Sequence, residues 1–186
     1  REKEAGSGFQ VSVLTPQGAN KSCCIKLKPE TRNLRSASIV SNGQERVVAI
    51  ASDHAGVALK ALLKPEVEAL GFSVRDLGTD TSDSVDYPAY GDAVANAVVS
   101  GTAEFGIAIC GSGIGISIAA NRVGGARAAL CHTGLHAALA RQHNDANILC
   151  LGARLIGEAE AKECVLRFLT TVFEGGRHAK RVGMLG

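Results

Sequence analysis

Short apolar runs and amphipathic segments alternate along the chain from Arg46 onward. Runs of four or five residues, mostly apolar except in Ser73–Leu77, predict strands at Val47–Ala51, Ser73–Leu77, Phe105–Ile109, Ala128–Cys131 and Ile148–Leu151. Longer segments, with apolar residues three or four positions apart, predict helices at about Val57–Leu70, Tyr87–Val99, Gly115–Asn121, Leu135–Gln142 and Ala159–Phe173. Pro65 is expected to kink the first of these helices or to start a second helical segment.

Strands that alternate with helices at this spacing predict a parallel sheet with helices on both faces. We therefore expect residues 46–186 to form one α/β domain, a doubly wound, Rossmann- or flavodoxin-like three-layer sandwich with a five-stranded parallel sheet. The expected strand order is 2-1-3-4-5, the commoner order for a sheet of this size. Residues 1–45 lack the alternation, and we interpret them as a flexible N-terminal extension or as a remnant of targeting or cloning.

Composition narrows the classes of function. The chain has 186 residues, 46% hydrophobic and 20% charged, which is typical of a soluble globular protein, and its apolar runs are too short to span a bilayer. The net charge is +2, and the densest positive charge is a short C-terminal cluster of Arg177, Lys180 and Arg181. Without a broad basic face, and with aromatic residues at 4%, nucleic acid is not an expected partner. A small anion fits this charge distribution better.

The six cysteines do not form a metal-binding or disulfide pattern. Cys23 and Cys24 are adjacent, and no Cys-x-x-Cys pair occurs. Cys131, Cys150 and Cys164 lie in apolar periodic segments and are expected to be small buried residues. We therefore expect no metal and a reducing, cytoplasmic location, with organelle targeting by residues 1–45 left open.

Candidate chemistry follows the predicted strands, because ligands of such folds bind beyond the carboxyl ends of the strands. Gly111, Gly113 and Gly115 follow the third strand and precede a helix, so their N–H groups could bind an anion. A tight packing turn is as good an interpretation, since the spacing matches neither a dinucleotide nor a Walker loop. Cys110 comes directly before the loop, where the helix dipole would favour a thiolate; the alternative is an inert strand-end cysteine.

Other polar residues have an ordinary interpretation beside a functional one. Asp53 and His54 follow the first strand and could be an acid–base pair or a simple helix cap. His143 could act chemically or be a solvated residue at a helix end. Arg177 and Arg181 could bind a phosphate or lie in solvent.

Six segments together resemble ribose-5-phosphate isomerase type B, which belongs with the galactose-6-phosphate and allose-6-phosphate isomerases. They are Ser52-Asp53-His54-Ala55-Gly56, Asp86-Tyr87-Pro88, Ile109–Asn121, Arg141–Asn147, Leu151-Gly152-Ala153-Arg154 and Gly175–Arg181. The resemblance covers about residues 46–186. It implies a cofactor-free aldose–ketose isomerase of the pentose phosphate pathway, which interconverts D-ribose 5-phosphate and D-ribulose 5-phosphate through a cis-enediolate.

The resemblance also implies roles for individual residues. Cys110 matches the thiolate base, and His143 matches the proton donor that opens the sugar ring. Ser112 is the third residue of the implied catalytic set. The implied substrate-binding residues are Asp53, His54, Tyr87, Gly111, Gly113, Ile114, Gly115, Asn144, Arg154, Arg177, His178 and Arg181.

Two positions differ within the family. Ser112 stands where the family often has Thr, and Ile116 stands where one branch has a Glu base, so this chain resembles the Cys-type branch. The resemblance implies a homodimer or homotetramer with sites between chains. An isomerase of a six-carbon sugar phosphate (allose 6-phosphate or galactose 6-phosphate) and a non-catalytic, phosphate-binding flavodoxin-like module remain as alternatives.

Overall fold

A computed structural model describes residues 45–185; residues 1–44, which hold nearly all of the expected N-terminal extension, lie outside the described range. The strands are β1 (Val47–Ser52), β2 (Ser73–Asp76), β3 (Phe105–Cys110), β4 (Ala128–Leu130) and β5 (Ile148–Gly152). The helices are α1 (Val57–Ala69), α2 (Tyr87–Val99), α3 (Ile114–Ala120), α4 (Gly134–Asn144), α5 (Glu158–Thr170) and α6 (Arg177–Val182), and a 3-10 turn, η1, covers His54–Gly56. None of these helices is long and apolar enough to cross a membrane.

The sheet is parallel throughout, and its five strands lie in the order β2-β1-β3-β5-β4. The predicted doubly wound α/β sandwich is therefore confirmed, but the expected order 2-1-3-4-5 is wrong, because β4 and β5 exchange places. Burial explains the exchange. All of β5 is buried, as an interior strand must be, whereas the three residues of β4 are half-buried and suit an edge.

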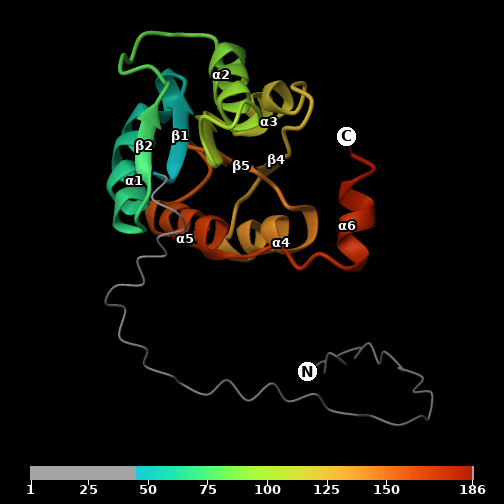
Figure 1. Cartoon of the computed structure of the whole chain (residues 1–186). Coiled ribbons are helices and arrows are strands. Elements are labelled where there is room, and N and C mark those ends of the chain that lie inside the picture. Colours follow the sequence, from blue (N-terminus) through green and yellow to red (C-terminus); the bar gives the residue numbers. More distant parts are fainter. Residues whose placement is uncertain (1–44, 186) are drawn as a thin grey trace, which may run out of the picture. The chain divides into compact units, whose positions relative to one another are not determined.

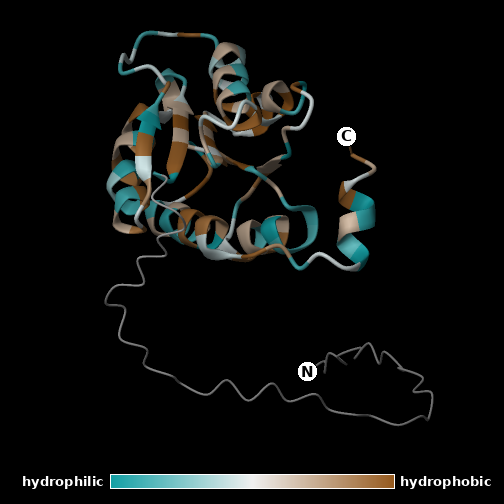
Figure 2. Cartoon of the chain, in the orientation of Figure 1, coloured by the Kyte–Doolittle hydropathy of each residue, from teal (hydrophilic) through white to brown (hydrophobic). Residues whose placement is uncertain are grey.

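Helices cover both faces of the sheet (Figure 1). One apolar cluster lies between the sheet and α1, α4 and α5, and a second lies between the sheet and α2 and α3. This division follows from right-handed crossovers: α4 leads from the edge strand back to β5, so it lies on the same face as α1. Figure 2 shows mostly apolar central strands and helices in which apolar and hydrophilic residues alternate, as in amphipathic helices.

Two local expectations differ from the structure. α1 continues through Pro65 as one helix. Pro65 and Ala61, whose carbonyl loses its usual donor, both lie on the exposed side of α1, where water can supply the missing bond. α5 ends at Thr170 rather than at Phe173, because Thr171 is extended.

The C-terminal segment then forms α6, an element that the sequence did not predict. Gly175 and Gly176 both have positive φ angles of 64° and 53°, and they turn the chain into this helix.

Candidate active site

The carboxyl ends of β1, β3 and β5 bring three of the predicted segments together. Asp53 donates its N–H to the carbonyl of Ile109 over 3.1 Å, so the end of β1 lies beside the end of β3. Ala153 and Arg154 donate their N–H groups to the carbonyls of Cys110 and Gly111 over 2.9 and 3.0 Å, which places the end of β5 on the other side. Cys110 therefore lies at the centre of this edge.

The thiol of Cys110 is held by the loop that follows it. The N–H of Gly113 donates to Sγ over 3.1 Å, and Cys110 is only 3% exposed. Gly113 has a φ of 76°, which is unfavourable for other residues. The glycine at this position therefore turns the backbone so that an N–H points at the sulfur.

Three further cysteines differ from Cys110 in their surroundings. Burial raises the pKa of Cys131 to about 11 and the pKa of Cys164 to about 12, and it raises the pKa of Cys150 further still. These thiols are fully buried and stay protonated near neutral pH, as expected for small core residues. They offer no base.

The glycine loop contacts two more of the predicted residues. The guanidinium of Arg154 lies beside Gly111, with Nη1 only 3.4 Å from where a Cβ would stand. The ring of Tyr87 lies against Gly115, with Cζ 2.5 Å from the corresponding position. A Cβ at Gly115 would displace the ring of Tyr87, whereas a Cβ at Gly111 would be in ordinary contact with Arg154, so of the two glycines only Gly115 is required by the packing of its neighbour.

Asp53 and His54 are both fixed by hydrogen bonds. Asp53 is 5% exposed, and its carboxylate accepts the N–H of Ala55 over 3.0 Å as the cap of η1. His54 accepts the N–H of Val85 at Nδ1 over 3.2 Å, which leaves Nε2 to carry the proton of the neutral ring. We call Asp53, His54, Tyr87, Arg154, Cys110 and residues 111–115 the Cys110 cluster.

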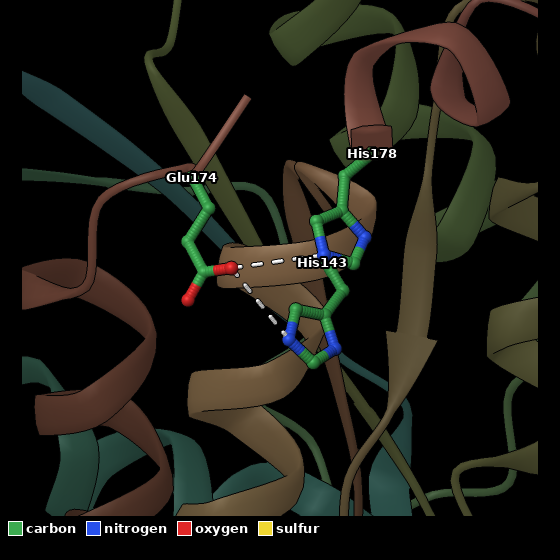
Figure 3. A group of neighbouring side chains, drawn as sticks. All are labelled: His143, Glu174 and His178. Carbon is green, nitrogen blue, oxygen red and sulfur yellow. Dashed lines mark ion pairs between the residues drawn. The ribbon is translucent and has the colours of Figure 1, made fainter. Parts of the chain in front are cut away.

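The remaining predicted residues form a second group at the end of α4. The rings of His143 and His178 stack with their centroids 4.3 Å apart and their planes at 4° (Figure 3). Glu174 faces both, its Oε2 lying 3.9 Å from Nε2 of His143 and 3.6 Å from Nε2 of His178. Arg177 Nε donates to Nε2 of His178 over 3.3 Å.

Burial, His143, Arg177 and Arg181 lower the pKa of His178, although Glu174 opposes them. Asn144, the last residue of α4, lines a pocket of about 330 Å³. We call His143, Asn144, Glu174, Arg177, His178 and Arg181 the His143 cluster.

His143, Glu174 and His178 are three potential metal ligands in one place, but their arrangement does not suit a metal. The lone pairs of parallel stacked rings lie in parallel planes and do not converge on one ion. The Nε2 atom of His178 also already accepts a hydrogen bond from a cation.

The Cys110 and His143 clusters lie at opposite edges of the sheet. Cys110 ends β3, whereas Asn147, just beyond the end of α4, accepts the N–H of Gly106 near the start of β3. Six strand residues span about 16 Å, and α4 runs back over a similar length. One chain therefore does not bring His143 to Cys110.

Sequence reasoning missed a buried charge network near the Cys110 cluster. Lys60 is 1% exposed, and its ammonium donates to Asp76 Oδ1, the carbonyl of Thr79 and Asp80 Oδ1 over 2.8, 2.9 and 2.9 Å. It fixes the start of the loop that leads to Val85, the partner of His54. The signal was present, since Lys60 falls on the same helix face as Leu63 and Val67.

Comparison with known proteins identifies the family of this fold and site. The family model for ribose/galactose isomerases matches residues 48–185. The chain belongs to the ribose/galactose isomerase family. Within it, ribose-5-phosphate isomerase B of Escherichia coli is 45% identical over 135 residues, 73% of this chain and 91% of that protein.

Solved structures of ribose/galactose isomerases agree with the fold. Ribose-5-phosphate isomerase B of Clostridium thermocellum is 49% identical with a TM-score of 0.74, over 75% of this chain and 95% of that one. The enzyme of Mycoplasma genitalium, solved with bound ribulose-5-phosphate, is 42% identical with a TM-score of 0.72, over 75% of this chain and 93% of that one. In this ribose/galactose isomerase, Ile116 stands at the position where one branch of the family has a Glu base. Ile116 is completely buried and is part of the apolar core.

Proposed function

We propose that this protein is a ribose-5-phosphate isomerase that interconverts D-ribose 5-phosphate and D-ribulose 5-phosphate with Cys110 as the base. The observation that carries the proposal is the Cys110 thiol held by the N–H of Gly113, in a chain similar to enzymes of that name. The relatives named above favour a five-carbon substrate over allose 6-phosphate or galactose 6-phosphate.

The chemistry is an internal exchange of oxidation state and consumes no cofactor. The Cys110 thiolate removes the proton from C2 of the open-chain aldose, the C1–C2 double bond forms, and O1 takes the negative charge. The thiol returns that proton to C1, and the proton on O2 passes to O1 as C2 becomes the carbonyl carbon. The ketose results.

The groups around Cys110 suit the other needs of this reaction. N–H groups of residues 111–115 and the hydroxyl of Ser112 stabilise the charge on the enediolate oxygens. Ser112 Oγ already accepts the N–H of Ile114 over 3.3 Å, which fixes the side chain so that its own hydrogen can be donated to the substrate. Asp53, His54, Tyr87 and Arg154 bind the sugar.

The His143 cluster reaches the substrate from a second copy of the chain. His143 donates the proton that opens the ring, Asn144 binds the sugar, and Arg177 and Arg181, with His178 beside them, bind the phosphate. The separation of the two clusters supports this assembly, because a two-fold axis that joins one cluster to the partner's other cluster creates two complete sites. Ile114 and Ile118, 52% and 59% exposed on α3, are apolar residues that a partner could cover. We infer a homodimer or homotetramer.

Complementation between two inactive variants tests both the base and the assembly. Cys110→Ser removes the base and His143→Ala removes the ring-opening acid, and each variant should lose about 10²- to 10⁴-fold in kcat. Mixed dimers contain one intact site, so an equal mixture that has exchanged subunits should regain about a quarter of parental turnover. The matched control is Cys131→Ser just after β4, two strands away from Cys110 in the sheet, which should keep parental kcat.

Each failure has a distinct meaning. Parental turnover by folded Cys110→Ser would exclude the thiolate base. No recovery in a mixture that forms mixed dimers would exclude sites shared between chains. Turnover of six-carbon sugar phosphates alone would assign the hexose reaction, and turnover of no sugar phosphate would favour the binding module.

A cytoplasmic location remains an expectation from the cysteines alone.

A further inference from the structure

The turn after α4 contains a residue in a conformation that favours glycine. Asp145 has φ 45° and ψ 41°, and it is the one non-glycine residue with positive φ in the described part of the chain. This left-handed conformation costs about 1–2 kcal/mol for a residue with a side chain. Asp145 directly follows His143 and Asn144, the last two residues of α4.

Two arginines compensate for the strained backbone. Arg141 Nη1 lies 2.8 Å from Asp145 Oδ1, and Arg127 Nη2 lies 3.0 Å from Oδ2. Arg127 Nε also donates to the carbonyl oxygen of Asp145 over 2.9 Å. The carboxylate of Asp145 is therefore held by two charge-assisted hydrogen bonds and its backbone carbonyl by one.

The arginines themselves are anchored in the body of the fold. Arg141 is 7% exposed, and its guanidinium lies 4.9 Å from the ring centre of Phe105 and 5.8 Å from that of Phe168. Arg127 directly precedes β4, and its N–H donates to Asn147 Oδ1 over 2.7 Å. Asp145 thus joins the end of α4 to the core on one side and to β4 on the other.

This attachment fixes the last turn of α4. Asp145 donates its N–H to the carbonyl of Arg141 over 3.2 Å, which is the 5→1 bond of an αL motif, and Ala146 donates to the carbonyl of Ala140 over 3.0 Å, so the helix ends here. A glycine would adopt this backbone without strain, but it would leave Arg127 and Arg141 without their carboxylate. Aspartate supplies a carboxylate that pairs with both arginines.

We propose that Asp145 is a positioning residue for His143 and Asn144, which it holds in the direction that the partner's substrate requires. The proposal rests on the proposed function, in which those two residues act on the sugar. Asp145 lies one and two positions from them and does not itself need to touch the substrate.

A double-mutant cycle separates positioning from a merely structural role. Asp145→Asn keeps the shape and tolerates the left-handed backbone but removes the charge, and it should lower kcat about 10- to 100-fold, since a small displacement of a catalytic group has effects of that size. In the His143→Ala background the same change should lower kcat by clearly less than in the parental background, because the acid is gone and only Asn144 remains to be positioned. The matched control is Asp92→Asn on the exposed side of α2, which should leave kcat unchanged in either background.

A second variant separates loss of positioning from loss of folding. Asp145→Gly removes the backbone strain together with the carboxylate, so its kcat should fall like that of Asp145→Asn, with thermal unfolding recorded for both. Equal losses from Asp145→Asn with and without His143, or parental kcat in both Asp145 variants, would overturn the proposal while the isomerase function stands. Absence of turnover by the parental protein, or parental turnover by His143→Ala, would overturn the proposed role of His143 and this inference with it.

Discussion

Gly113 offers a direct test of the link between the loop and the thiol. Gly113→Ala adds one methyl group to a residue with a φ of 76°. The new Cβ would stand 2.5 Å from Leu130 Cδ1, 2.8 Å from the carbonyl carbon of Leu151 and 2.9 Å from the nitrogen of Gly152. Two of these neighbours are backbone atoms of β5, which cannot move aside as a side chain can. The loop must shift instead.

The expected cost has two parts. Alanine in the left-handed region costs about 1–2 kcal/mol, and overpacking typically costs a further 1–3 kcal/mol. A total of about 3 kcal/mol lowers Tm by about 10 °C for a domain of this size. A shift of the loop also takes the N–H of Gly113 away from Cys110 Sγ, now 3.1 Å apart, so kcat should fall on the order of 10²-fold.

The assay is steady-state isomerisation of ribose 5-phosphate, together with thermal unfolding, at a temperature where every variant is folded. Gly124→Ala is the matched control, because a methyl group there meets nothing within 4 Å and the residue has no positive φ. It should keep parental Tm and kcat. A Gly113→Ala protein with lowered Tm but parental kcat would refute the coupling of loop geometry to catalysis, and unchanged Tm would refute the packing argument.

Two further predictions concern charges. Burial raises the pKa of Asp76, but hydrogen bonds led by Lys60 outweigh it and hold that pKa below its ordinary value. The stability that this carboxylate contributes is therefore present above about pH 4 and is lost as the pH falls through its lower folded pKa. Urea unfolding from pH 2 to 7 should show that the free energy of unfolding falls less steeply with acid in Lys60→Met than in the parental protein. The same pH dependence in both proteins would contradict the pairing. Arg177→Ala and Arg181→Ala should each lower kcat/KM about 10- to 150-fold if each loses a charge-assisted phosphate contact of about 1.5–3 kcal/mol. Arg122→Ala, at an exposed position, is the control. Parental kinetics in either variant would show that its arginine does not bind the phosphate.

Much of the Cys110 cluster was predictable from local pattern. Apolar runs locate parallel strands, and residues that follow such strands share one edge of the sheet. That rule placed Asp53, Cys110 and Arg154 together, and in the structure backbone hydrogen bonds join the three strand ends that carry them. The same rule, read in reverse, separates His143 from Cys110, because residues that precede a strand lie at the other edge.

The sequence by itself determined the alternation of strands and helices, the α/β class and the glycine loop behind Cys110, since these follow from periodicity and short-range chemistry. Only the tertiary structure decided the positions of β4 and β5, the stacking of His143 on His178, and the anchoring of Asp145 by Arg127. Each of these depends on which distant segments pack together, and hydrophobic periodicity specifies that a face is buried without specifying its partner.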